Sequence, residues 1–424
     1  MFKTRGKYDG FFEGDYRKSK SSGHGLRKKR RKPLFGLAAI FIILIFAVAC
    51  VFHFGFAKKK TGEVPQEVIP KIEKRKPQKE YILAPRAMNK IGDADSGYIP
   101  RSEIHKLDIS EIEIKPGRNI LDIQIPRDRK GLPRIGPSVL VDFDSMKIIW
   151  GYRANETGQI ASMTKMMLMF VTFALADSGV FSLLDTVKVT DEAPLMGGSQ
   201  AYLDRGEEYT ISQLLSGIAV CSANDAAYLL AQFISGGDIS KTIELMNKFG
   251  TRLGLKNTKF YNAHGLPPAR SGKDIADGVA IQKYKKRNIY VAKKPNTSTP
   301  IEMAKLAVAF CRYPRLLLYT NISVDSLWDA NMERPFGPYL MNNHFKAVKD
   351  PYIDGIKTGY TVGAGYCVTA SAIKNGRRLI AVVFDAQTQD LRDAFIKKLF
   401  DTAFDSLGIK DSLADTISTS ELKK

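Results

Sequence analysis

The sequence predicts an α+β fold in which helices cover one antiparallel sheet, a helical lobe is inserted into that sheet, and one transmembrane helix precedes the domain. Three observations predict this arrangement. Apolar runs of strand length occur at both ends of residues 135–409, and longer apolar segments with helical stop signals lie between them. An Asn-Gly pair at residues 375–376 separates two of the C-terminal runs, which favours an antiparallel hairpin. An uncharged run at residues 34–57 is long enough, at roughly 1.5 Å per residue, to cross a hydrocarbon core about 30 Å thick.

The distribution of charge predicts the orientation of this apolar run. A basic cluster at residues 27–32 precedes the run, and a smaller one at residues 58–60 follows it. Because the heavier cluster is N-terminal, the positive-inside rule predicts a basic cytoplasmic tail at residues 1–33 and places the rest of the chain outside. These topology determinants, together with contacts to anionic lipid, explain the net charge of +20 better than nucleic-acid binding does.

The cysteines and histidines indicate neither a disulfide framework nor a metal site. Cys50 would lie within the apolar run, so an odd number of the four cysteines is left outside the membrane. The five histidines are scattered, and we expect no metal ion and no cofactor. Two alternatives for the N-terminal segment stay open: a cleaved signal peptide, and a lipoprotein acylated on Cys50.

Residues 58–134 are predicted to form a linker and stalk. Residues 58–80 are rich in Lys, Glu and Pro, which is typical of an extended and solvated segment. Partial alternation of apolar and polar residues at 109–114 and 120–125 predicts some strand in the remainder. The compact domain is expected to begin near residue 135.

The first half of the domain is predicted to be a hairpin followed by helices. Residues 138–143 and 147–152 are apolar runs on either side of a turn. The long apolar stretch at 163–176, followed by Asp177-Ser-Gly179, predicts a buried helix with a C-terminal stop. Further helices are predicted at residues 212–220, 224–234 and 300–310, the last with Ser298 or Thr299 as its N-cap.

The C-terminal part of the domain returns to strands. Strands are predicted at residues 356–360, 365–373 and 379–385, with a hairpin turn at 374–377 between the last two. A covering helix with a Gly408 stop is predicted at residues 391–407, and a polar tail at 410–424.

Residues 162–165, Ser-Met-Thr-Lys, are the first of three short strings that indicate chemistry. Ser162 and Lys165 stand three positions apart at the predicted start of a helix, so both side chains lie on one face. A serine hydroxyl needs a nearby base to become a nucleophile, and a buried lysine held neutral can be that base. The same spacing recurs at residues 371–374 and 420–423, but in a predicted strand and in a polar tail. A helix cap with a solvated lysine is the structural alternative.

The second and third strings lie further along the chain. Ser222-Ala-Asn224 falls at the junction of two predicted helices, where a hydroxyl and an amide can face one cleft. Lys357-Thr-Gly359 falls on a predicted strand, where a cation and a hydroxyl can hold a carboxylate and glycine allows close backbone approach. The structural alternatives are a helix N-cap and a solvated edge-strand lysine. A second Lys-Thr-Gly, at residues 60–62, lies in the linker.

Together the three strings resemble the motif set of penicillin-recognising serine acyl transferases. Residues 135–408 resemble the D-alanyl-D-alanine carboxypeptidases, the low-molecular-mass penicillin-binding proteins. Four further runs are similar to that family: Gly206-Glu-Glu-Tyr-Thr-Ile-Ser-Gln-Leu-Leu215, Tyr261-Asn-Ala-His-Gly-Leu-Pro267, Asp354-Gly-Ile-Lys-Thr-Gly-Tyr-Thr361 and Gly363-Ala-Gly-Tyr-Cys-Val-Thr-Ala-Ser-Ala372. The resemblance implies the fold shared by penicillin-binding proteins and β-lactamases, and a catalytic domain on the periplasmic side of a bacterial inner membrane. It also implies peptidoglycan stem peptides as substrates and β-lactam antibiotics as inhibitors.

The resemblance also implies the roles of individual residues. Ser162 would attack the D-Ala-D-Ala carbonyl, Lys165 would be the general base, and Ser222 would pass a proton to the leaving amine. The backbone N–H groups of Ser162 and Tyr360 would form the oxyanion hole. The other residues expected to bind substrate are Asn224 at the peptide, Lys357, Thr358 and Arg392 at its terminal carboxylate, and Gly359 beside them.

Two features depart from the family pattern. Residues 268–297 are interpreted as an insertion, either a solvated surface loop or a basic contact with anionic cell-wall polymer or lipid. The sequence also ends soon after the covering helix, so the family's common C-terminal β-domain is not expected, and the N-terminal helix would replace its anchor.

The leading prediction is a D,D-carboxypeptidase, and three alternatives stay open. The first is a D,D-endopeptidase of the same fold, which cleaves peptidoglycan cross-links. The second is a class A β-lactamase, which is disfavoured because no Glu-x-x-Leu-Asn motif lies between the second and third strings. The third is a catalytically silent wall-binding protein, against which the intact strings argue.

Overall fold

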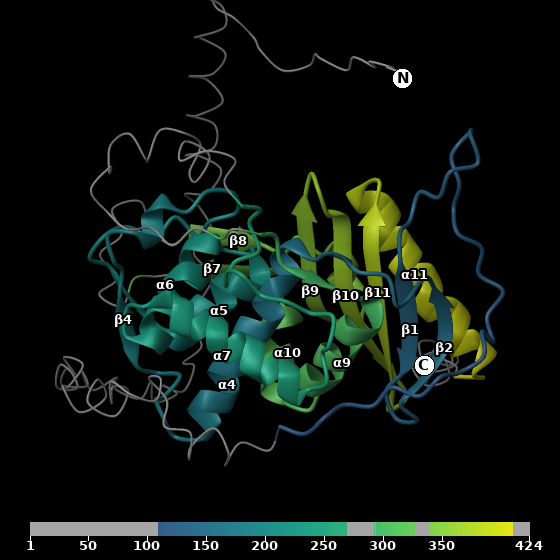
Figure 1. Cartoon of the computed structure of the whole chain (residues 1–424), viewed down its shortest axis with the longest axis horizontal. Helices are drawn as coiled ribbons and strands as arrows, with labels where there is room; N and C mark the ends of the chain where they lie inside the picture. The colour runs from purple at the N-terminus through teal and green to yellow at the C-terminus, as the bar shows by residue number, and fades with distance from the viewer. Residues whose placement is uncertain (1–108, 269–291, 293, 328, 330–338, 410–424) are drawn as a thin grey trace, which may run out of the picture. The chain divides into compact units, whose positions relative to one another are not determined.

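The computed structural model describes residues 109–268, 292, 294–327, 329 and 339–409 (Figure 1). The segments predicted as the cytoplasmic tail, the transmembrane helix and the polar C-terminal tail lie outside these residues. So do most of the linker and most of the predicted insertion. Within the described ranges, no helix is long and apolar enough to cross a membrane.

The centre of the domain is a five-stranded antiparallel sheet, as predicted, with strand order β2-β1-β11-β10-β9 (Figure 1). Its strands are β1 (Ser138–Asp142), β2 (Lys147–Tyr152), β9 (Ile353–Thr361), β10 (Gly365–Lys374) and β11 (Arg377–Ala386). Strand β1 pairs with β11, so the start and the end of the domain meet in one sheet. In the β10–β11 turn, Asn375 has φ 48° and Gly376 has φ 76°, the left-handed values that a two-residue hairpin turn requires.

A helical lobe is inserted between β2 and β9 (Figure 1). Its helices, with two short 3₁₀ turns, are η1 (Ala161–Thr164), α4 (Lys165–Asp177), η2 (Ala193–Leu195), α5 (Ile211–Val220), α6 (Asn224–Ser235), α7 (Ile239–Arg252), α9 (Pro300–Cys311) and α10 (Pro314–Thr320). The four helices predicted in this region correspond to α4, α5, α6 and α9. Thr299 is the N-cap of α9, and its side chain accepts a hydrogen bond from the Glu302 N–H.

Two helices of the lobe were not among the predicted elements. Helix α7 buries Ile243, Met246 and Phe249 on one face at helical spacing, so its sequence does carry a helical signal. Helix α10 is short and begins at Pro314, directly after α9 ends, so it reads easily as a loop.

Three short two-stranded ladders complete the lobe and its borders. They pair β3 (Gly158–Gln159) with β6 (Thr297–Ser298), β4 (Thr186–Lys188) with β5 (Glu208–Thr210), and β7 (Val324–Leu327) with β8 (Tyr339–Asn342). A 3₁₀ turn, η3 (Lys346–Lys349), follows β8. The β3–β6 pair matters for the site, because it brings residues 297–298 beside the segment that leads into η1.

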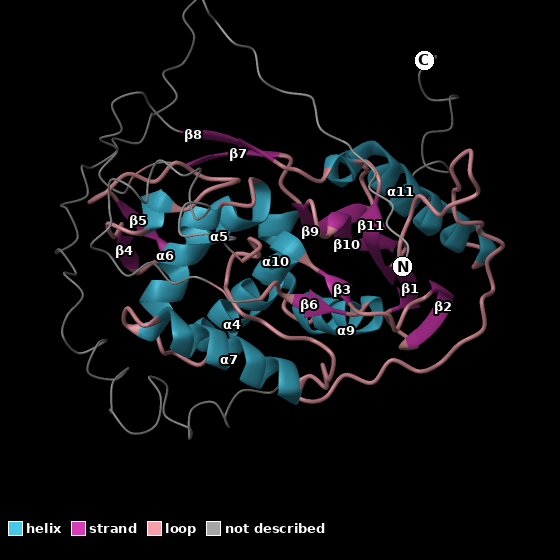
Figure 2. Ribbon diagram, turned by 45° about the horizontal axis from the view of Figure 1, so that its top comes forward, coloured by secondary structure: helices cyan, strands magenta, loops and turns pink. Residues whose placement is uncertain are grey.

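Helices cover both faces of the sheet (Figure 2). On one face, α9 and the lobe pack against Val139 and Val141 of β1, within the larger of two apolar cores. On the other face, α11 (Gln389–Ser406) packs against Leu140, within the second core. The alternation of β1 residues between the two cores is what a strand buried on both faces requires.

The described part of the predicted stalk, residues 109–134, is extended and packs against the domain. It contains no strand. Isolated bridges such as Lys115 with Lys147, and single hydrogen bonds such as that from the Ile120 N–H to the Ile149 carbonyl at 3.0 Å, link it to its neighbours. Ile112 enters the larger core, while Ile123 enters the second core and accepts a hydrogen bond from Trp150 Nε1 through its carbonyl, at 3.3 Å. Its apolar residues therefore fill gaps between elements rather than one face of a sheet, so the packed region extends upstream of residue 135.

Candidate active site

The turn η1 places Ser162 and Lys165 together at the start of α4. Lys165 Nζ lies 2.9 Å from Ser162 Oγ, as expected for side chains on one face of a helix start. The preceding residue, Ala161, has φ 43°, a left-handed value that is unusual for a residue other than glycine. The nucleophile candidate therefore sits on a strained turn, which is a common feature of active sites.

Two glycines allow other segments to approach this turn closely. A Cβ on Gly265 would lie 2.1 Å from the Ala161 carbonyl oxygen, and Gly265 has φ +88°. A Cβ on Gly359 would lie 2.7 Å from the Ile160 carbonyl oxygen and 3.1 Å from the Ser162 nitrogen. Strand β9 and the loop after α7 are thus packed directly on the backbone that carries Ser162.

Lys165 is fully buried, and its amine is surrounded by acceptors. Its Nζ lies 2.6 Å from Asn224 Oδ1 and 2.6 Å from the His264 carbonyl oxygen. Burial, and secondarily the charge of Lys357, lowers the pKa of Lys165 well below its usual value. A neutral amine has two N–H groups for these two acceptors, which leaves its lone pair for the Ser162 hydroxyl. Lys165 can therefore accept a proton from Ser162, and the solvated-lysine alternative does not fit its burial.

The second string forms the junction between α5 and α6. Asn224 is the first residue of α6, and its Nδ2 donates to the Gly197 carbonyl at 2.7 Å. Ser222 is 2% exposed with φ 61°, and its hydroxyl has no hydrogen-bond partner among the described residues. The N-cap of α6 is Ala223, which lacks a capping side chain, so neither Ser222 nor Asn224 serves as the helix cap. A buried hydroxyl without a partner remains available to a bound substrate.

Asp225 follows this string and was not predicted as part of the site. Its buried carboxylate accepts hydrogen bonds from the Ala201 and Leu203 N–H groups, at 3.0 and 3.1 Å. Burial raises the pKa of Asp225, although the backbone N–H groups oppose that shift. The contact ties the loop between η2 and β5 to the start of α6. The sequence signal for it is weak, because a carboxylate that binds distant backbone N–H groups leaves no local pattern.

The third string lies on β9, at the edge of the sheet that faces η1. Lys357 is 2% exposed, which excludes the alternative of a solvated edge lysine. Burial lowers the pKa of Lys357 to about 7, and the charge of Arg392 contributes to the shift. Thr358 is also buried, whereas Tyr360 is 52% exposed and stacks on Tyr366 of β10. A titratable cation and a hydroxyl therefore stand next to the Ser162 turn.

Arg392, on α11, lies near enough to Lys357 to lower its pKa, but is held by protein acceptors. Its Nε donates to Asp393 Oδ1 at 2.7 Å, and its Nη2 donates to the His344 carbonyl at 3.2 Å. The residue is only 2% exposed. In this structure Arg392 therefore positions the loop that carries His344, and contact with a substrate carboxylate remains a prediction.

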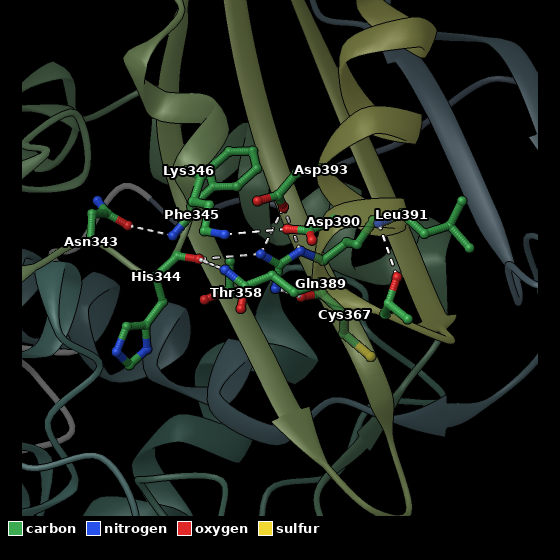
Figure 3. Close-up of polar contacts among 12 residues, drawn as sticks. Asn343, His344, Phe345, Lys346, Thr358, Cys367, Gln389, Asp390, Leu391 and Asp393 are labelled. Atoms are coloured by element: carbon green, nitrogen blue, oxygen red, sulfur yellow. Dashed lines mark hydrogen bonds and ion pairs between the residues drawn. The ribbon is translucent and has the colours of Figure 1, made fainter.

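Two histidines near the lysines were also not predicted as site residues. His264 is buried, and desolvation together with the charge of Lys165 lowers its pKa to about 3. His344 keeps contact with solvent, but partial burial and the charges of Lys357, Lys165 and Arg392 lower its pKa to about 4. In Figure 3 the His344 imidazole is turned away from the carbonyl that accepts the hydrogen bond from Arg392. Both imidazoles are neutral at pH 7.

Together these residues have the groups needed for acyl transfer from a substrate that carries a carboxylate. Ser162 has the position of a nucleophile and Lys165 that of its base, and the start of a helix can supply backbone N–H groups to an oxyanion. Lys357 and Thr358 can hold an anionic group. Among the described residues, no cluster of His, Cys, Asp and Glu side chains could hold a metal ion.

Comparison with known proteins gives the same indication. Residues 134–388 match the family model of D-alanyl-D-alanine carboxypeptidases, Peptidase_S11. The chain is 36% identical over 267 residues to D-alanyl-D-alanine carboxypeptidase DacF of Bacillus subtilis, covering 63% of this chain and 61% of that protein. It is 30% identical over 291 residues to DacA of Escherichia coli K12, covering 67% and 64%. The matches thus span less than two thirds of the length of these relatives. A D-alanyl-D-alanine endopeptidase of E. coli is 25% identical over 252 residues, covering 59% of this chain and 71% of that protein.

Solved structures share the fold. Penicillin-binding protein 5 of Haemophilus influenzae superposes with a TM-score of 0.54 at 26% identity, over 67% of this chain and 72% of that one. Penicillin-binding protein D2 of Listeria monocytogenes, solved in its ampicillin-bound form, superposes with a TM-score of 0.52 at 21% identity, over 64% and 97%. The predicted antiparallel sheet with its inserted helical lobe is therefore the architecture of penicillin-binding proteins.

Proposed function

Because this chain belongs to the D-alanyl-D-alanine carboxypeptidase family, we propose that it removes the terminal D-alanine from peptidoglycan stem pentapeptides through an acyl-enzyme on Ser162. The observation that carries the proposal is the buried amine of Lys165, 2.9 Å from the Ser162 hydroxyl and with a lowered pKa. A serine without such a base is a poor nucleophile at neutral pH. A scaffold or wall-binding protein would have no need of this pair.

The reaction proceeds in two steps. Ser162 Oγ attacks the carbonyl carbon between the two D-alanines while Lys165 Nζ takes the hydroxyl proton. The backbone N–H groups of Ser162 and Tyr360 stabilise the oxyanion. The C–N bond then breaks, and the proton reaches the departing amine through Ser222, so that D-alanine leaves and an ester remains on Ser162. Water hydrolyses that ester, with Lys165 again as the base, and restores the free serine.

Recognition of a terminal carboxylate favours a carboxypeptidase over an endopeptidase. Lys357 and Thr358 lie beside the Ser162 turn, on a strand that Gly359 allows to approach it. A buried cation binds a carboxylate more strongly than a solvated one does. In a cross-linked peptide, the residue after the scissile bond is larger than D-alanine, because its side chain leads into a second stem peptide. That side chain must also fit beside Lys357 and Thr358. Endopeptidase activity is therefore the second candidate.

β-Lactams are proposed inhibitors of the same site. They carry a strained amide and a carboxylate in the arrangement that the Ser162 and Lys357 groups would recognise. Acylation of Ser162 would leave a slowly hydrolysed ester.

We further propose that residues 34–57 anchor the chain in the bacterial inner membrane, with the catalytic domain outside. The uncharged length of that segment and the basic cluster before it support this placement.

The proposal is tested with the purified full-length chain and two muropeptides, a stem pentapeptide and a cross-linked dimer. Mass spectrometry should detect free D-alanine from the pentapeptide at a higher rate than monomers from the dimer. A penicillin should add its mass to the peptide that contains Ser162. The Ser162→Ala variant should lose both reactions. The matched control is Ser371→Ala, which should keep both. Ser371 belongs to the second Ser-x-x-Lys string, on β10, and its hydroxyl contacts Arg378 and Cys311. Absence of product and of adduct in the unaltered chain would refute the enzyme proposal.

A further inference from the structure

The side chain of Asn296 lies between the nucleophile turn and the loop that carries His264. Asn296 is 2% exposed and stands just before β6, at the far end of the segment interpreted as an insertion. An amide buried this deeply is costly unless its donors and acceptor are all paired. Its partners are therefore informative about its role.

On one side, Asn296 holds both ends of the turn that carries Ser162. Its Nδ2 donates to Thr164 Oγ1 at 2.7 Å, and Thr164 stands between Ser162 and Lys165. Its backbone carbonyl accepts a hydrogen bond from the Ile160 N–H at 3.2 Å, just before the turn begins. A turn that contains a left-handed Ala161 needs such external contacts to keep its shape.

On the other side, the same amide organises the loop before Leu266. Asn296 Oδ1 accepts from the Tyr261 N–H at 2.6 Å and from the Asn262 N–H at 3.2 Å. The Asn262 side chain in turn accepts from the His264 and Gly265 N–H groups, at 3.2 and 2.5 Å. These contacts fix the orientation of the peptide that presents the His264 carbonyl to Lys165.

We propose that Asn296 is a positioning residue for acyl transfer, which sets the distances among Ser162 Oγ, Lys165 Nζ and the His264 carbonyl through Thr164 and Asn262. This inference rests on the proposed function. The Asn296 amide contacts two segments at once. One carries Ser162 and Lys165, and the other carries the His264 carbonyl that accepts from Lys165. If it were lost, the two segments could shift independently. A misplacement of about 1 Å in a reacting group can reduce a rate on the order of 100-fold.

The experiment measures acylation of the full-length chain by a penicillin, as a maximal rate and a half-saturating concentration. Asn296→Ala and Thr164→Val should each lower the maximal rate about 10- to 100-fold. The half-saturating concentration should stay within about twofold, because both side chains are buried and bonded to protein groups. Thr164→Ser keeps the hydroxyl that accepts the bond and should retain nearly the full rate. The double variant should be no slower than the slower single variant, because both substitutions remove the same contact.

A matched control separates positioning from general stability. Asn247 is an amide whose Nδ2 donates to the Phe260 carbonyl and whose Oδ1 accepts from the Phe260 N–H, at 2.9 and 3.0 Å, at the base of the same loop. Asn247→Ala should lower the melting temperature while the acylation rate per folded molecule is kept. If Asn296→Ala and Thr164→Val behave like Asn247→Ala, the positioning role is refuted. If the unaltered chain is not acylated at all, the proposed function fails instead.

Discussion

At the scale of single residues, the candidate site contains two buried lysines whose pKa values are both lowered. Lys165 is fully buried, and burial, together with the nearby charge of Lys357, lowers its pKa well below the usual value. Lys357 has a pKa of about 7, so near neutrality part of the population carries a cation there. The first lysine suits proton transfer and the second suits anion binding. A charged Lys357 also favours the neutral form of Lys165, because it lowers the pKa of that amine.

The pH dependence of catalysis should reveal the titration of Lys357. Its cation is present below the pKa of about 7 and lost above it, so kcat/KM for a peptide with a free C-terminal carboxylate should fall above that pH. The same peptide with an amidated C-terminus should be a poor substrate and should lack this alkaline decline. The measurement is kcat/KM from about pH 5.5 to 9.5 for both peptides. Equal declines for the two peptides would contradict the assignment of Lys357 to carboxylate binding.

The residues that the sequence could predict in this site are those in local strings. Ser162 with Lys165, and Lys357 with Gly359, are recognisable because the chemistry needs fixed spacings on one helix turn or one strand. The His264 carbonyl has no such signature, since any residue can supply a backbone oxygen. Asp225 and Asn296 contact backbone or side-chain groups far along the chain. Their roles depend on tertiary contacts that no short pattern records.

At the scale of elements, the site is an intersection of a turn, a loop and an edge strand. Gly265 and Gly359 bring the loop and β9 against the turn η1, at separations that any Cβ would prevent. Many elements of the fold were predictable from local sequence. The β10–β11 hairpin follows from Asn375-Gly376, and α9 follows from its threonine cap. The contact of η1, β9 and the loop of Gly265 was not predictable, because it depends on packing between segments far apart in sequence.

Replacement of Gly265 by alanine should damage both stability and acylation. The added Cβ would overlap the Ala161 carbonyl, and φ +88° is unfavourable for alanine. We expect the acylation rate to fall together with the melting temperature. Gly376→Ala is the matched control, because Gly376 also has a left-handed φ of +76° but no atom lies within 4 Å of the added Cβ. It should cost only about 1–2 kcal/mol of stability and leave acylation unchanged. Acylation at the full rate in Gly265→Ala would show that the close approach is unnecessary.

At the scale of the whole molecule, the fold buries ionisable groups whose pKa values differ from those of the unfolded chain. His264 is neutral in the folded state down to a pKa of about 3, whereas an exposed histidine titrates near 6.5. The unfolded chain therefore binds the proton first as the pH falls below about 6.5. This contribution to stability is complete above that pH and is lost progressively towards pH 3.

Acidification should accordingly destabilise the protein through His264. Between pH 7 and pH 5 the linkage amounts to roughly 2 kcal/mol. In the unaltered chain, His264 Nδ1 accepts a hydrogen bond from the Leu266 N–H. The variant His264→Asn keeps an acceptor for that N–H but has no group that titrates. Its free energy of unfolding should fall by about 2 kcal/mol less over this interval than that of the unaltered chain. Denaturant titrations at the two pH values measure the difference. His344 and the buried carboxylates change equally in both proteins, so a zero difference would contradict the buried neutral imidazole.

The larger apolar core extends without interruption from the sheet into the lobe, and it includes residues of both β9 and α4, the elements that carry Lys357 and Lys165. It includes Val139 from β1, Ile356 from β9 and Met166 from α4, so β9 cannot separate from α4 without exposing apolar side chains to water. The site is consequently preorganised before a ligand binds and does not need a hinge motion to form. A ligand that binds there meets Ser162, Lys165 and Lys357 in positions that the folded chain has already set. Little of the binding energy is then consumed in assembling them.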